Sequence, residues 1–94
     1  MFLSFDQKRK IFKSFPELSE KIISNGRVNY IFEGSMQDKK VLARELSYTG
    51  NGYVYGGYLP EYKTEVDARG WINIRDYNEK ALKELILKVI ESFK

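Results

Sequence analysis

The closing stretch of the chain, NEKALKELILKVIESFK (Asn78–Lys94), carries the clearest structural pattern. Asn78 stands where the capping side chain of a helix is expected. The apolar residues that follow recur at the spacing of one helical face: Leu82, Leu85, Ile86, Val89, Ile90 and Phe93. The pattern predicts a long amphipathic helix, which at about 1.5 Å per residue would cross most of a four- or five-stranded sheet.

Upstream of this helix the apolar period shortens from 3.6 residues to 2, which is typical of half-buried strands. The alternation is clear in Val28, Tyr30 and Phe32, and it continues over residues 40–48, 53–59, 62–66 and 71–74. Short connections join these segments, whereas parallel strands need long crossovers. The sequence therefore predicts an antiparallel meander of four or five strands.

Two helices are predicted ahead of the sheet. Residues 4–13 begin with Ser4 and Gln7, a pair that fits a capping box. Phe15-Pro16 ends this helix, because a residue before proline avoids helical backbone angles. A second helix is expected at about residues 16–24, with Asn25-Gly26 as its C-terminal stop.

Together these elements predict one α+β domain over residues 1–94. It has two short N-terminal helices, a four- to five-stranded antiparallel meander sheet and a long C-terminal amphipathic helix packed on one sheet face. Strand alternation places Leu42 and Leu46 on the same face as Tyr53 and Tyr55. That face is the more apolar one, so we expect the terminal helix to cover it.

Composition narrows the chemistry that the chain can perform. It contains no cysteine and no histidine, which removes disulfides, thiolate metal sites and the commonest metal ligand. Acid–base catalysis would fall to carboxylates, lysine or tyrosine, each with a strongly shifted pKa. We therefore expect no enzyme activity, no metal site and no cofactor.

Charge and hydropathy bear on partners and location. The net charge of +3 is mildly basic, and by itself it does not predict binding to nucleic acid. No apolar run is long enough to span a membrane, and the first residues lack the pattern of a signal peptide. The sequence therefore favours a cytoplasmic protein, and its residue usage favours a bacterial one.

The candidate binding residues are aromatic and basic. Their rings and cations suit stacking on bases and contact with phosphates, yet tyrosine rings also bury well in a core. The sequence leaves both interpretations open. The strand region contributes Arg44, Tyr53, Tyr55, Trp71 and Arg75, and the first helix contributes Arg9, Lys10 and Lys13.

Three hypotheses for function follow from these residues. The first is a small non-catalytic module that binds or regulates another protein, since catalytic residue types are missing while aromatic ones are plentiful. The alternative is binding of single-stranded nucleic acid through the candidate residues. A third is a magnesium-dependent nuclease-like enzyme that uses Asp38 with Glu61 and Lys63. Leu87 is the one large apolar residue on the polar side of the last helix, where it offers a modest contact for a second copy of the chain. We therefore expect a monomer or a weak homodimer.

Overall fold

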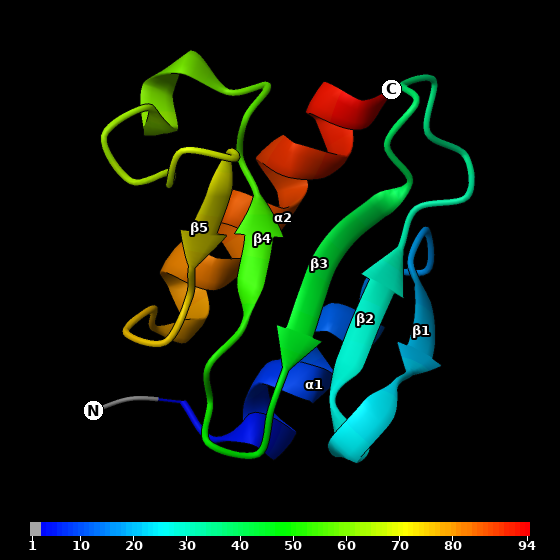
Figure 1. The fold of residues 1–94 in the computed structure, drawn as a ribbon, viewed down its shortest axis with the longest axis vertical. Helices are drawn as coiled ribbons and strands as arrows, with labels where there is room; N and C mark the ends of the chain where they lie inside the picture. The colour runs from blue at the N-terminus through cyan, green and yellow to red at the C-terminus, as the bar shows by residue number, and fades with distance from the viewer. Residues whose placement is uncertain (1–2) are drawn as a thin grey trace.

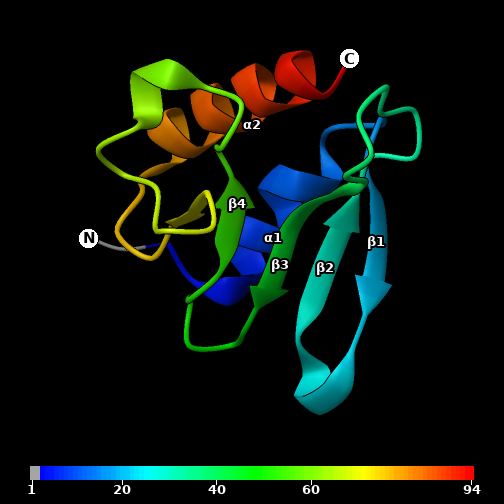
Figure 2. The same ribbon diagram turned by 45° about the horizontal axis from the view of Figure 1, so that its top comes forward.

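A five-stranded antiparallel sheet forms one layer of the molecule, and both helices lie on one side of it (Figures 1 and 2). The structure, a computed structural model, describes residues 3–94. The predicted α+β meander is confirmed, and the radius of gyration is 12.0 Å, the size expected of one small domain. The strands neighbour one another in chain order: β1 (Ser19–Ile22), β2 (Val28–Ile31), β3 (Val41–Leu46), β4 (Tyr53–Tyr55) and β5 (Trp71–Asn73).

Both helices begin at the caps that the sequence predicts. Ahead of α1 (Phe5–Lys13), Ser4 Oγ accepts from the Gln7 backbone N–H at 3.1 Å and Gln7 Oε1 accepts from the Ser4 N–H at 2.8 Å. Asn78 caps α2 (Glu79–Phe93) by accepting from the Ala81 N–H. All the apolar residues of the predicted α2 face are buried. They form the core with the helix-facing side of the sheet.

The prediction of a second N-terminal helix is wrong. Ser19–Ile22 form β1, which pairs with β2, and Ser24–Gly26 form a short 3-10 turn between them. Asn25 and Gly26 both have positive φ, 62° and 73°. Their left-handed conformation, interpreted as a helix stop, instead closes a β-hairpin, because pairing with β2 outweighs the helical spacing of the apolar residues.

The predicted strand at residues 62–66 is also wrong. β4 ends at Tyr55, Pro60–Tyr62 form a 3-10 helix, and the chain continues through turns to residue 66. Pro60 has no N–H to donate to a ladder, and its fixed φ suits the start of such a turn. The sheet still has five strands, because β1 forms where the sequence predicts a helix and makes up for the missing strand at residues 62–66.

Irregular pairing of β3 decides which side of the sheet holds the core. Val28 pairs with Leu46 and Tyr30 pairs with Ala43, so two residues of β3 stand opposite one residue of β2. Glu45 lies in this bulge with a φ of 57°. A second register shift follows between Tyr30 and the next residue of β2.

These bulges overturn the predicted facing of the sheet. Leu42 and Leu46 turn to the side of Val54, where all three are buried with α2. Tyr53 pairs with Arg44 on the opposite side, whereas the Tyr55 ring also contacts Phe93 of α2 edge to face, at 6.2 Å between centroids. The expectation that the terminal helix covers Leu42 and Leu46 is confirmed, but the expectation that Tyr53 shares their side is wrong, because strict alternation along β3 does not hold across a bulge.

Candidate functional site

Both helices pack on one side of the sheet, and no helix covers the other side (Figure 1). We call it the open face and define it by three cross-strand pairs: Ile31 with Val41, Arg44 with Tyr53, and Tyr55 with Trp71. Residues paired across strands share a face of the sheet. The fold thus brings together four of the predicted candidate residues, from β3, β4 and β5.

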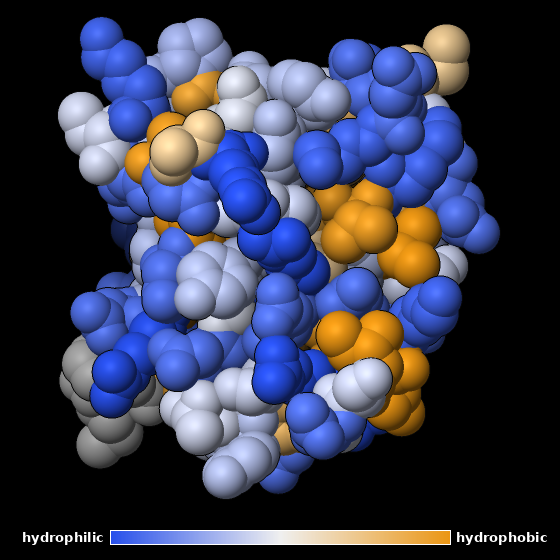
Figure 3. All heavy atoms as spheres, viewed as in Figure 1, coloured by the Kyte–Doolittle hydropathy of each residue, from blue (hydrophilic) through white to orange (hydrophobic). Residues whose placement is uncertain are grey.

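The open face has a mixed character. Figure 3 shows apolar surface gathered over β2 and its neighbours, next to a hydrophilic band that crosses the middle of the sheet. Ile31 of β2 and Val41 of β3 are a half-buried aliphatic pair on this face. Sequence reasoning missed these two, because it considered only aromatic and charged residues as candidates.

Two cations lie over the aromatic part of the open face. The Arg44 guanidinium carbon is 4.3 Å from the centre of the Trp71 ring. Lys39 Nζ is 4.6 Å from the centre of the Tyr55 ring and 5.1 Å from that of Trp71. Trp71 is consequently only 5% exposed although no helix covers it. Lys39 belongs to the loop between β2 and β3, whose path no sequence pattern predicts.

Glycines at positions 57 and 70 leave the space that the Tyr55 ring occupies. A Cβ atom on Gly57 would come within 2.5 Å of the Tyr55 hydroxyl, and one on Gly70 within 2.8 Å of the ring. Gly70 also has a φ of 91°, which side chains disfavour. The ring contacts Trp71 edge to face at 5.2 Å between centroids.

Arg44 is not satisfied by the carboxylates near it. Its Nε is buried and has no hydrogen-bond partner within residues 3–94. Glu45 Oε2 is 3.8 Å away, too far for a hydrogen bond, and Glu45 Oε1 accepts from Arg27 at 2.7 Å. Backbone N–H groups of Trp71 and Arg69 hold the pKa of Asp67 below its usual range, and the charge of Arg44 adds to this effect.

The remaining predicted candidates lie elsewhere. Lys10 and Lys13 are exposed on α1, in the layer opposite the open face. Arg75 follows β5 in a turn where its N–H donates to Asn73 Oδ1. The eight candidates therefore do not form one surface.

Arg9 is a structural residue in this arrangement. Its Nε and Nη2 donate to the two carboxylate oxygens of Glu20, each at 2.8 Å, and the Tyr30 hydroxyl donates to Glu20 at 2.9 Å. The hydrogen bonds from Arg9 lower the pKa of Glu20 to about 2. The pair ties α1 to the edge strand β1.

Lys8 makes a second set of contacts between α1 and the rest of the molecule, which the sequence did not predict. Its side chain lies on the apolar side of α1, a position from which a lysine normally extends its ammonium group to solvent. Instead it is fully buried, and Nζ donates to the carbonyls of Gly50 and Arg75. Burial lowers the pKa of Lys8 from its ordinary value.

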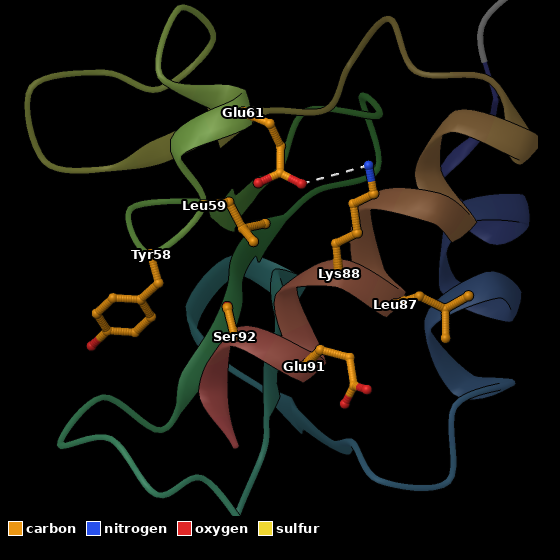
Figure 4. Close-up of a pocket in the computed structure, with 7 residues that line it drawn as sticks. All are labelled: Tyr58, Leu59, Glu61, Leu87, Lys88, Glu91 and Ser92. Carbon is orange, nitrogen blue, oxygen red and sulfur yellow. Dashed lines mark ion pairs between the residues drawn. The ribbon is translucent and has the colours of Figure 1, made fainter.

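A groove of about 470 Å³ runs beside α2 on the helix layer (Figure 4). Its apolar lining includes Leu59 and Leu87, and Leu87 is 56% exposed. Lys88 Nζ lies 3.7 Å from Glu61 across it, so Glu61 of the nuclease hypothesis is ion-paired. Within residues 3–94 no three carboxylates gather as a metal site requires.

Comparison with known protein families, curated proteins and solved structures finds no match to this chain. Among residues 3–94 no helix has the length and apolar character needed to cross a membrane. The case for function therefore depends on the chemistry of the open face.

Proposed function

We propose that this chain is a non-catalytic binding domain that holds another protein on the open face of its sheet. The observation that carries the proposal is the placement of both helices on one side, which leaves the other side without a helical cover. Neighbouring strands hold Arg44 beside Tyr53 on that uncovered side, and both side chains are only half-buried. Arginine and tyrosine are two of the residue types that dominate the energetics of protein interfaces.

The apolar part of the face supports a protein partner. Ile31 and Val41 form a half-buried aliphatic pair beside the aromatic residues. Interfaces between proteins combine an apolar centre with aromatic residues and arginine, as this face does. A nucleic-acid strand would make little use of the aliphatic half, because its affinity comes mainly from phosphates and stacked bases.

The size of the face also fits. It lies on the broadest side of the molecule, which measures 29 × 26 Å. The whole of that side is comparable with the roughly 800 Å² that each partner buries in a standard interface, so the molecule has room for one partner there.

Site-specific photocrosslinking in the cells that make the protein tests this proposal. p-Benzoylphenylalanine replaces Tyr53 on the open face, and in the control it replaces Lys80, which is exposed on α2. We expect a discrete adduct from position 53 that protease degrades and nuclease does not, and none from position 80. No adduct from position 53, or the same adducts from both positions, would reject the proposal.

Single-stranded nucleic acid is a second candidate ligand, favoured by Lys39 and Arg44 lying over two aromatic rings. Against it, the Trp71 ring is covered by these cations and offers no free surface to a base. Titration with mixed-sequence oligonucleotides, followed by amide NMR shifts, separates the two. Shifts clustered on β4 and β5 would favour nucleic acid, and no shifts at low salt would remove it.

A further inference from the structure

We infer that Arg44 and Lys39 form a clamp for a carboxylate, so that the open face takes an acidic, extended segment of its protein partner. The inference rests on the proposed function and adds the chemistry of the partner. The clamp consists of the Arg44 guanidinium and the Lys39 ammonium, held over Trp71 and Tyr55.

The Trp71 ring fixes the guanidinium before any ligand arrives. The guanidinium carbon lies 4.3 Å from the centre of the ring and Nε is buried, while the side chain as a whole stays 34% exposed. The planar fork of arginine matches a carboxylate in a bidentate arrangement. Because the stacking restricts the rotamer in advance, binding costs less conformational entropy.

Arg44 forms a long ion pair with Glu45 at 3.8 Å, but within the described residues its Nε makes no hydrogen bond. The Lys39 ammonium lies over the two aromatic rings. Glu45 is engaged by Arg27, and Asp67 accepts from the backbone N–H groups of Arg69 and Trp71. A ligand carboxylate would contact the part of the Arg44 guanidinium that stays exposed, since the side chain is 34% exposed although its Nε is buried.

The surroundings favour a protein carboxylate over the phosphates of a nucleic acid. Bases have no ring to stack on at Trp71, because its side chain is only 5% exposed. The aliphatic pair Ile31 and Val41 lies on the same face, where apolar side chains of an extended segment can pack. The expected ligand thus alternates or combines acidic and apolar residues.

An NMR titration of the full chain tests the clamp with defined probes. The probe is the peptide acetyl-Glu-Val-Glu-Leu-Glu-amide, and its control is the same peptide with glutamine in place of glutamate. We expect the Arg44 Nε–H and Trp71 indole N–H signals to shift with the acidic peptide at a Kd of about 1 mM or tighter. The glutamine peptide should leave both signals in place.

Two matched variants locate the effect. Arg44→Lys keeps the charge but loses the planar fork, so we expect affinity for the acidic peptide to fall about tenfold. Arg69→Lys makes the same exchange at an exposed turn position and should change nothing. The amide spectrum away from the open face verifies that each variant is folded.

Several results would overturn the clamp. These are equal shifts with the glutamine peptide, no shifts with either peptide, or an Arg44→Lys affinity equal to that of the unaltered chain. Tighter binding of a twelve-residue oligo(dT) to the same signals would assign the site to nucleic acid instead. If the clamp fails while position 53 still crosslinks to a protein, the proposed function stands with a partner that is held without an acidic group.

Discussion

At the scale of single residues, Glu20 carries a pH dependence with a clear sign. Two hydrogen bonds from Arg9 and one from the Tyr30 hydroxyl lower its pKa to about 2 in the folded chain. A carboxylate with a depressed folded pKa stabilises the protein above its unfolded pKa, and the contribution is lost as pH falls towards the folded value. The expected loss between pH 5 and pH 2 is about 2 kcal/mol, discounted because Arg9 is partly exposed.

Urea unfolding at pH 7 and pH 3 measures this contribution. In Glu20→Gln the carboxylate is gone, so the stability at pH 7 should fall while its dependence on pH flattens. The same slope in both proteins would show that the acid sensitivity comes from other carboxylates.

At the scale of elements, the bulge in β3 makes an unusual demand on Glu45, whose φ is 57°. Glycine adopts that angle freely and a β-branched residue does not, so Glu45→Gly should be more stable than Glu45→Val by about 2 kcal/mol. At Ile31 of β2, where φ is not positive, the order should reverse because valine suits an extended strand. Thermal unfolding of the four variants checks both orders. Glycine below valine at position 45 would contradict the left-handed conformation of the bulge.

The elements also show how far sequence patterns reach. α2 could be predicted because its six apolar positions and its Asn78 cap all agree with one period. β1 could not, because Leu18, Ile22 and Ile23 also fit a helical spacing, and only pairing with β2 makes Ser19–Ile22 a strand. Local pattern decides long amphipathic elements, and tertiary pairing decides short edge strands.

At the scale of the whole molecule, the open face could be predicted only in part. Arg44, Tyr53, Tyr55 and Trp71 stand out by residue type, and alternation correctly groups Arg44 with Tyr53. The side of the sheet on which the helices pack could not be predicted, because a bulge of one residue moves Leu46 to the opposite side from Arg44. Lys39 completes the site through a loop, so it too depends on the assembled fold.

The two-layer arrangement makes a last prediction about α2 that compares two leucines of the same helix. Leu85 is fully buried against the sheet, whereas Leu87 is 56% exposed on the other side. Leu85→Ala removes core packing and leaves a cavity, so we expect a loss of about 3 kcal/mol, a large share of the roughly 5–15 kcal/mol that stabilises a small domain. Leu87→Ala should cost less than about 0.5 kcal/mol, since it removes little buried surface. Urea unfolding monitored by circular dichroism measures both, and helix propensity cancels because the substitution is the same in each. Equal losses, or a larger loss at Leu87, would mean that α2 presents a different face to the sheet.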